Sequence, residues 1–234
     1  MFKTKMATVF KWKSEGNPMS QIEIVPLKAD SVRKASRLLS KSFLDNPSST
    51  CILDNMPVKK RRKKLYLLHL GLTKACIVYG HASAVLYNGE LAGVSLVYPP
   101  GSYPFSIWAW LCSGMGGLVV GPRYTWRYAT IDSHLRKKHI KEKHWYLYVL
   151  AVANHQQGKG LGSVLVRRLS EQAGHEDLPC YLETDKPENI NIYKSLGYEV
   201  IGEDTFSKLG GLTIWYMLRP SRKSKLTSLE KVQS

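Results

Sequence analysis

A short glycine-rich run, Gln157–Gly162 (QGKGLG), combines residue types and spacing that suit the binding of a phosphate group. Its three glycines let the backbone approach a bulky anion closely. The run lies between an apolar segment, residues 145–152, and a segment with helical apolar spacing, residues 161–173. Amides at the start of a helix favour negative charge. The run fits either a phosphate-binding turn or an ordinary turn from a strand to a helix.

Two common phosphate motifs do not match this run. A P-loop needs Gly-Lys followed by Ser or Thr, whereas Gly160 follows Lys159. A dinucleotide-binding loop needs the spacing G-x-G-x-x-G, whereas here the last glycine, Gly162, comes one residue early and Ser163 takes its place. The sequence therefore favours a different phosphate-containing ligand.

The pattern Gln-x-x-Gly-x-Gly resembles the pyrophosphate loop of the GNAT superfamily of N-acetyltransferases. Together with the segments around it, the loop resembles in particular the puromycin N-acetyltransferase-like branch of that superfamily. Other family segments occur at the expected spacing around the loop, in this order: His144–Leu147, Leu150–Val152, Leu182–Thr184, Asn189–Tyr193 and Gly197-Tyr198. The resemblance is close over residues 143–200 and weaker over residues 22–98 and 212–220. It implies an α/β GNAT fold. In that fold a mixed sheet of six to seven strands carries helices on its faces, and its fourth and fifth strands splay apart.

The resemblance also implies acetyl-CoA as cosubstrate, with no metal. Backbone groups near Leu150 and Val152 would pair with the pantetheine arm, and an amide there would hold the thioester oxygen as it gains charge. The residues assigned to acetyl-CoA are Leu150, Ala151, Val152, Gln157, Gly158, Lys159, Gly160, Leu161, Gly162 and Asn189. Asn189 substitutes for an asparagine that many relatives carry earlier, where this chain has Asp185-Lys186.

Two side chains are the candidates for proton transfer. Tyr193 occupies the family position of the general acid that protonates the CoA thiolate, although a tyrosine between apolar neighbours also fits a core position. Glu183, at the end of its strand, is the candidate base for the amine, or else a structural carboxylate. His144, Tyr146 and Tyr148 are further candidate bases.

The acceptor is expected to be the amine of a small molecule, attacked directly in a ternary complex. Residues 99–140 form an aromatic-rich helical insertion in which Trp108, Trp110 and Trp126 either line an acceptor pocket or pack in the core. A protein or peptide amine remains the alternative, as does a regulatory module that binds CoA without turnover. The sequence does not indicate an oligomeric state.

Local patterns predict the elements that position these residues. Residues 22–27 alternate as a strand, and residues 30–43 and 58–78 have helical spacing, the latter with a basic first half. Asn88-Gly89 predicts a type I′ hairpin between two strands, residues 82–87 and 91–98.

The whole chain is expected to hold one GNAT domain, residues 19–220, between a disordered basic extension, residues 1–18, and a disordered tail, residues 221–234. The net charge of +16 is compatible with nucleic acid, but no aromatic-interleaved nucleic-acid motif accompanies it. No apolar run is long enough to span a membrane, and the four cysteines show no paired or metal-ligand spacing. These features favour a cytoplasmic protein that contacts neither membrane nor nucleic acid.

Overall fold

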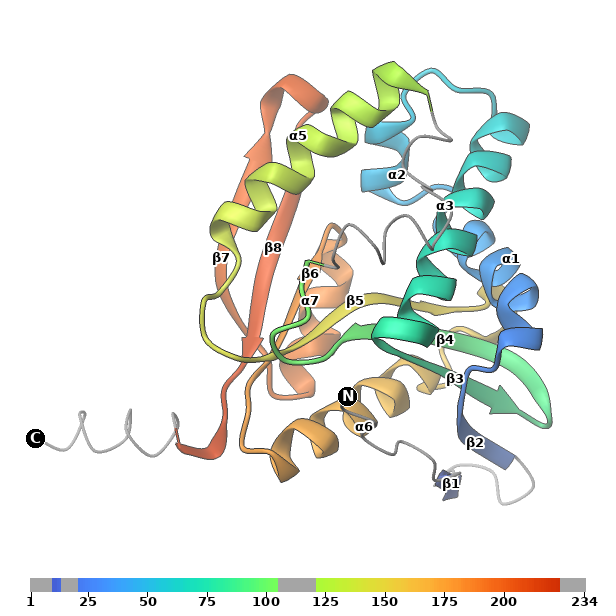
Figure 1. Cartoon of the computed structure of the whole chain (residues 1–234), viewed down its shortest axis with the longest axis vertical. Coiled ribbons are helices and arrows are strands. Elements are labelled where there is room, and N and C mark those ends of the chain that lie inside the picture. Colours follow the sequence, from blue (N-terminus) through green and yellow to red (C-terminus); the bar gives the residue numbers. More distant parts are fainter. Residues whose placement is uncertain (1–9, 14–20, 105–120, 224–234) are drawn as a thin grey trace, which may run out of the picture.

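A computed structural model describes residues 10–13, 21–104 and 121–223 of the chain. Within them, one mixed sheet has the strand order β1-β2-β3-β4-β5-β6-β8-β7 (Figure 1). β5 and β6 are parallel, and every other neighbouring pair is antiparallel. The expected mixed sheet with flanking helices is confirmed, but in the described residues it has eight strands instead of six to seven because β1 adds an edge strand.

The strands are β1 (Phe10–Lys13), β2 (Gln21–Pro26), β3 (His81–Tyr87), β4 (Glu90–Tyr98), β5 (Trp145–Val152), β6 (Cys180–Thr184), β7 (Glu199–Phe206) and β8 (Leu212–Arg219). The α-helices are α1 (Val32–Ser42), α2 (Pro47–Ile52), α3 (Val58–Tyr79), α5 (Pro122–Lys138), α6 (Leu161–His175) and α7 (Pro187–Ser195). Short 3₁₀ turns are η1 (Ala29–Ser31), η3 (Asn154–Gln156) and η4 (Ser207–Leu209).

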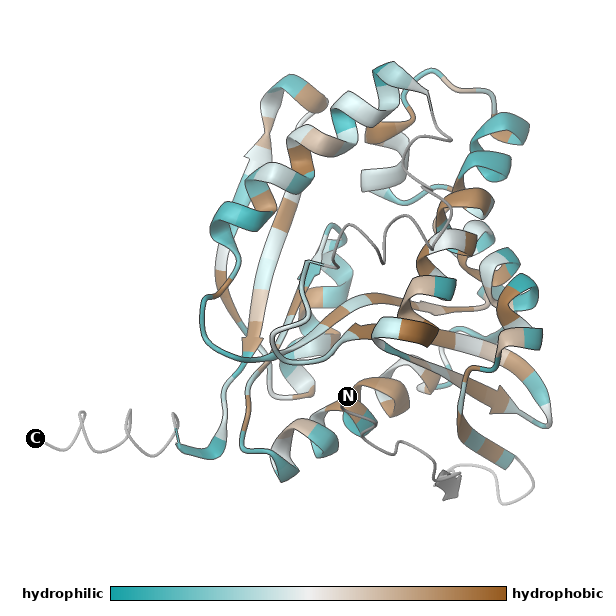
Figure 2. Ribbon diagram, viewed as in Figure 1, coloured by the Kyte–Doolittle hydropathy of each residue, from teal (hydrophilic) through white to brown (hydrophobic). Residues whose placement is uncertain are grey.

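Helices α1 and α3 cover one face of β3, β4 and β5. Ala35, Leu38 and Leu39 follow helical spacing in α1, and they pack with Cys76 of α3 in one buried cluster against these strands. Figure 2 shows that α3 changes from hydrophilic in its first half to hydrophobic in its second half. The second half of α3 therefore anchors the helix to the sheet.

Helices α6 and α7 cover the opposite face. Leu161, Val164 and Leu165 of α6 pack against buried side chains of β2, β3 and β4. Tyr193 of α7 joins another cluster on this face, which includes Trp145. Helix α5 packs instead through Ile131 in the cluster that holds Tyr98 and Tyr146.

An extra residue in β5 interrupts its pairing with β4. Val149 is opposite Leu96 and Leu147 is opposite Val97, so Tyr148 is a β-bulge. Because side chains alternate along a strand, the extra residue resets the alternation. Tyr146, Tyr148 and Val149 accordingly line the same cavity.

Most elements confirm the sequence patterns, with a few differences. Asn88 and Gly89 have φ angles of 52° and 81°, which confirms the type I′ hairpin. Phe10–Lys13 lies inside the extension expected to be disordered, yet it pairs with β2 as an edge strand. Helix α2, which begins at Pro47, was not expected. No helix in the described part of the chain has both the length and the apolarity needed to cross a bilayer.

Candidate active site

The strands β5 and β6 part after a short parallel stretch. They pair only from Trp145 to Leu147 on β5, whereas β5 continues to Val152. Between residues 148 and 152, β5 has no strand partner on that side among the described residues. The splayed fourth and fifth strands expected from the sequence are these two strands.

The open edge of β5 carries unpaired backbone groups. Ala153 N donates to Ala92 O at 2.8 Å, which makes these two residues a hydrogen-bonded pair at the end of the β4–β5 ladder. Such pairs alternate with non-hydrogen-bonded pairs in an antiparallel ladder. The backbone groups of Leu150 and Val152 therefore point away from β4 and toward the gap, as required for pairing with a pantetheine arm.

The glycine-rich run follows this edge after the short 3₁₀ turn η3. Gly158 and Gly160 have φ angles of +80° and +72°, which favour glycine, and an added Cβ at either would meet open space. Gly160 caps α6, and the first bond within the helix runs from Val164 N to Gly160 O. The amides of residues 161–163 thus remain at the helix N-terminus, where the dipole favours an anion.

Side chains around the run hold its shape. Val152 O accepts hydrogen bonds from Ser42 Oγ at 3.1 Å and from Gln157 Nε2 at 3.3 Å. Lys159 Nζ donates to Gln156 Oε1 at 2.7 Å and lies 4.5 Å from the centre of the Tyr87 ring. Because Val152 O is already bonded, the Val152 amide and both backbone groups of Leu150 are the ones left to pair with a ligand along the open edge.

A cavity of about 680 Å³ lies where β5 and β6 part. Its walls come from α3 and α5, and its floor comes from tyrosines of β4 and β5, including Tyr98, Tyr146 and Tyr148. Glu183, Thr184 and Asp185 line it at the carboxyl end of β6. The cavity is within the size range of small-molecule sites, and its lining is mostly apolar.

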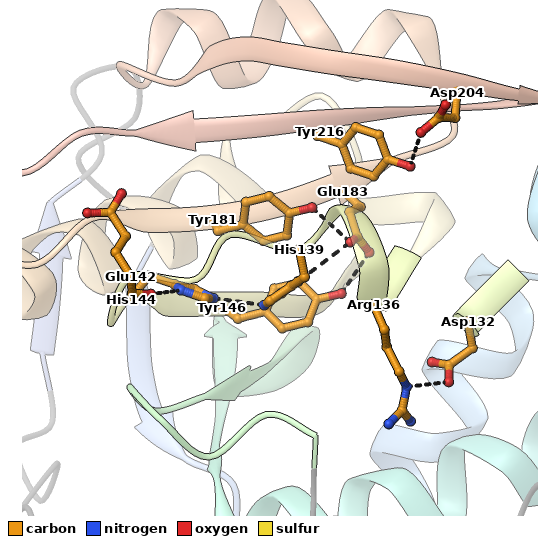
Figure 3. Close-up of polar contacts among 10 residues, drawn as sticks. All are labelled: Asp132, Arg136, His139, Glu142, His144, Tyr146, Tyr181, Glu183, Asp204 and Tyr216. Atoms are coloured by element: carbon orange, nitrogen blue, oxygen red, sulfur yellow. Dashed lines mark hydrogen bonds and ion pairs between the residues drawn. The ribbon is translucent and has the colours of Figure 1, made fainter. Parts of the chain in front are cut away.

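Glu183 is held in this cavity by two phenols (Figure 3). Tyr146 Oη donates to Glu183 Oε2 at 2.7 Å, and Tyr181 Oη donates to Glu183 Oε1 at 3.0 Å. The carboxylate side chain is 12% exposed. Burial raises the pKa of both phenols, and the carboxylate adds to the shift. The phenols therefore remain neutral donors, and Glu183 is fixed with one edge toward the cavity.

Tyr193 lies in a buried core cluster and is not among the residues that line the cavity. Its ring is 5.9 Å from that of Tyr198, centre to centre. Burial, with a smaller contribution from the charge of Asp185, raises the pKa of Tyr193 to about 12. The phenol thus stays protonated at neutral pH, as a general acid must.

Asn189 lies near the same end of β6. Its Nδ2 donates to Thr184 Oγ1 at 3.3 Å, and that hydroxyl also accepts from Lys186 N at 3.3 Å. These contacts fix the start of α7 next to the strand end. Asn189 therefore orders the connection from Glu183 to Tyr193, and its binding of acetyl-CoA stays a prediction.

A model of the Acetyltransferase (GNAT) family matches residues 59–198, which contain the parted strands, the glycine-rich run and both candidate catalytic residues. The chain belongs to this family.

Similar proteins agree with this assignment. A fission yeast (Schizosaccharomyces pombe) protein named as an uncharacterized N-acetyltransferase is 26% identical over 181 residues, covering 74% of this chain and 72% of the yeast protein. A solved structure from Corynebacterium glutamicum, titled histone acetyltransferase HPA2 and related acetyltransferase, has a TM-score of 0.63 and 23% identity, covering 85% of this chain and 95% of the other. Arylalkylamine N-acetyltransferase 2 from Aedes aegypti has a TM-score of 0.57 and 14% identity, covering 85% and 98%. The two solved structures are similar in fold.

Of the three tryptophans expected at the GNAT acceptor pocket, the described residues include Trp126. Trp126 is 66% exposed and does not line the cavity, so both interpretations of it, pocket wall and core residue, are wrong. Trp126 lies on the exposed side of α5, because Ile131 is the residue that this helix buries. Trp108 and Trp110 lie outside the described residues.

Three residues of this GNAT site were not singled out by their sequence pattern. His69, on α3, lines the cavity and stays neutral because burial lowers its pKa to about 4. His139 follows α5 and lies 3.9 Å from Glu183, measured from Nδ1 to Oε1. Asp185 accepts hydrogen bonds from Asn46 and Ser48. No local pattern indicates any of the three, because their places in the site depend on contacts between segments far apart in sequence.

Replacing Asp185 with alanine should lower the free energy of unfolding by about 1–3 kcal/mol, because a buried and a partly buried donor lose a charged acceptor. Asn46 Nδ2 donates to both carboxylate oxygens at 2.8 and 2.7 Å, and Ser48 N donates at 2.7 Å. Denaturant unfolding measures the change. Asp45→Ala is the control, since the Asp45 side chain is 82% exposed and should change stability by less than about 0.5 kcal/mol. Equal effects of the two changes would contradict the structural role of Asp185.

Proposed function

We propose that this GNAT protein transfers an acetyl group from acetyl-CoA to the primary amine of a small molecule with an apolar, aromatic body. The observation that carries the proposal is the open edge of β5, residues 148–152, which runs from the glycine-rich turn to the cavity that holds Glu183. This edge spans about 13 Å at the usual rise of a strand. It provides a path for the pantetheine arm from the diphosphate to the acceptor.

The proposed reaction is direct attack in a ternary complex. Amides of residues 158–162 bind the diphosphate, and the backbone of Leu150 and Val152 pairs with the pantetheine arm. Glu183 removes a proton from the acceptor ammonium, and the free amine attacks the thioester carbonyl. A backbone amide on the open edge of β5 stabilises the oxyanion. Collapse of the tetrahedral intermediate breaks the carbon–sulfur bond, and Tyr193 protonates the departing thiolate. The nitrogen loses its second proton in this step, and that proton restores the Tyr193 phenol through solvent.

The cavity supports a small amine with an aromatic body as the acceptor. Its described lining contains three carboxylates, Asp132, Glu183 and Asp185, but one guanidinium, Arg136, although the whole chain carries a net charge of +16. An ammonium group is attracted to such a lining, and tyrosine faces add cation–π attraction. The resemblance of residues 143–200 to the puromycin N-acetyltransferase-like branch and the name of the Aedes neighbour agree with this acceptor class.

A basic protein acceptor fits the surface less well. The exposed cations of the first half of α3, in the run Lys59–Lys64, would repel a basic peptide. Free thiols at Cys51, Cys76 and Cys180 agree with the reducing environment of a cytoplasmic location, which we also propose.

Release of free CoA thiol, with the product identified by mass spectrometry, tests the proposal. The acceptors are 2-phenylethylamine, a linear aliphatic diamine and a lysine-containing peptide, each with acetyl-CoA. We expect the highest kcat/KM with 2-phenylethylamine. Faster acetylation of the peptide would assign a protein acceptor. Acetyl-CoA binding without thiol release for any amine would assign a regulatory module and overturn the proposal.

A further inference from the structure

We infer that His139 is a proton-relay residue that takes from Glu183 the proton of the acceptor ammonium. The inference rests on the proposed function and goes beyond it, because the resemblance and the family assignment give His139 no role. It depends on a chain of contacts that links Glu183 to His139, His144 and the backbone of Glu142 (Figure 3).

The backbone carbonyl of Glu142 fixes the proton positions in this chain. His144 Nδ1 lies 2.6 Å from Glu142 O, and a carbonyl oxygen only accepts, so Nδ1 carries the proton. Neutral His144 then has a bare Nε2. Because His139 Nε2 lies 2.9 Å from that atom, His139 donates through Nε2. The remaining ring nitrogen of neutral His139, Nδ1, therefore has no proton.

The bare nitrogen of His139 faces the candidate catalytic carboxylate. His139 Nδ1 is buried without a hydrogen-bond partner among the described residues, and it lies 3.9 Å from Glu183 Oε1. The His139 side chain is 10% exposed. A buried acceptor atom without a partner is costly, so its retention points to a role that uses the lone pair. A proton at this atom would complete an ion pair with Glu183.

The surroundings of His139 are suited to hold that proton temporarily. The titratable groups packed against the ring are Tyr103, His144, Tyr146, Tyr181 and Glu183. Burial raises the pKa of all three tyrosines, so they stay neutral. Burial lowers the pKa of His144, and its hydrogen bond to the Glu142 carbonyl opposes part of this shift. Glu183 is thus the one negative group in direct contact with the ring among the described residues.

One further charged pair lies on the α5 side of this cluster. Arg136 Nε donates to Asp132 Oδ2 at 2.6 Å, and the guanidinium carbon lies 5.8 Å from the centre of the Tyr103 ring. Because these two opposite charges offset each other, the electric field at His139 comes mainly from Glu183.

The proton moves in three steps, from the ammonium to Glu183, from Glu183 to His139 and from His139 to water. Glu183 removes one proton from the acceptor ammonium, which breaks an N–H bond and forms an O–H bond. The Glu183 carboxyl then passes this proton to His139 Nδ1, which restores the carboxylate and forms an imidazolium. His144 Nε2 accepts the Nε2–H of that imidazolium throughout. The proton leaves His139 for water when the products leave, and the free enzyme is regenerated.

Acceptors that differ only in amine pKa test this relay. We compare 2-phenylethylamine, which is an ammonium ion at neutral pH, with its β,β-difluoro analogue, in which fluorine lowers the amine pKa. His139→Gln should lower kcat/KM for 2-phenylethylamine about 100-fold, the lower range for loss of a proton-transfer group. The fluorinated amine needs no such transfer, so its kcat/KM should fall by less than about threefold. In the variant, kcat/KM for 2-phenylethylamine should rise more steeply with pH than in the wild type, because the enzyme then depends on amine that is already deprotonated in solution.

His134→Gln is the matched control. His134 lies on the same helix, α5, and its Nε2 is 3.1 Å from Asp204 Oδ2, outside the relay. The His134→Gln variant should keep wild-type kcat/KM for both amines and the wild-type dependence of kcat/KM on pH. His144→Gln is a second relay variant, and it should reduce 2-phenylethylamine turnover selectively even if His139→Gln proves unstable.

Two results would overturn the relay without affecting the proposed function. One is an equal loss for both amines in His139→Gln, and the other is no loss for either. Nitrogen-15 NMR of the imidazoles in the wild-type protein gives a readout that does not depend on turnover. We expect Nε2–H with bare Nδ1 at His139 and Nδ1–H at His144, and the opposite tautomers would also reject the relay. A wild-type protein that acetylates no amine would instead reject the proposed function.

Discussion

Replacing Tyr193 with phenylalanine should lower kcat about 100- to 1,000-fold, within the range for a lost general acid, and should change acetyl-CoA affinity less than about twofold. The Tyr193 phenol is buried with its pKa raised to about 12 by burial and by Asp185, so it remains protonated across the working pH range. The change removes the proton that the thiolate needs and keeps the ring that packs in the core. Steady-state kinetics at saturating acceptor, with calorimetry for acetyl-CoA, measures both effects.

Tyr198→Phe is the matched control for this prediction. Tyr198 is buried in the same cluster, with its ring 5.9 Å from that of Tyr193, but it is assigned no proton transfer. The control should keep kcat within about threefold, since small changes away from reacting groups have small effects. Unchanged turnover in Tyr193→Phe, or equal losses in both variants, would remove Tyr193 from the chemistry.

Gly160→Asp should weaken acetyl-CoA binding at least tenfold. The φ angle of +72° at Gly160 costs other residues roughly 1–2 kcal/mol. The carboxylate also places a negative charge at the N-terminus of α6, where the diphosphate of acetyl-CoA is expected to bind. Calorimetric titration with acetyl-CoA measures the affinity of the variant.

Gly210→Asp controls for strain and charge in the Gly160 experiment. Gly210 also has a positive φ, +77°, and an added Cβ there meets open space, but it lies on the turn between β7 and β8. It should bind acetyl-CoA with wild-type affinity. Wild-type affinity in Gly160→Asp as well would show that the glycine-rich run does not bind the diphosphate.

Local sequence patterns were sufficient to predict most of the fold. The Asn88-Gly89 hairpin and strand β5 depend on neighbouring residues, and the structure has both. The bulge at Tyr148 could not be predicted, because it exists only in the register between β4 and β5. The hydrogen bonds from Asn46 to Asp185 join residues 139 positions apart, and no local pattern encodes such a contact.

The parts of the candidate site that depend on local sequence could be predicted. The parts that depend on packing between distant segments were harder to predict. The glycine-rich run and Glu183 were predicted because the run comes soon after a strand and Glu183 lies at the carboxyl end of the next one, in the expected order. The aromatic lining was expected from tryptophans of the insertion, yet Trp126 is exposed, and tyrosines of β4 and β5 line the cavity instead. Alternation of Tyr146 and Tyr148 along β5 was the signal for this lining. The buried Nδ1 of His139 required the complete three-dimensional structure.

A crystal structure of the protein with CoA would test the central claim most directly, that the open edge of β5 guides the thiol from the glycine-rich turn to Tyr193. We expect the diphosphate against the amides of residues 158–162, the pantetheine arm paired with Leu150 and Val152, and the sulfur within about 3–4 Å of Tyr193 Oη, a distance that permits proton transfer to sulfur. CoA bound elsewhere, or a sulfur that points away from Tyr193, would contradict this account.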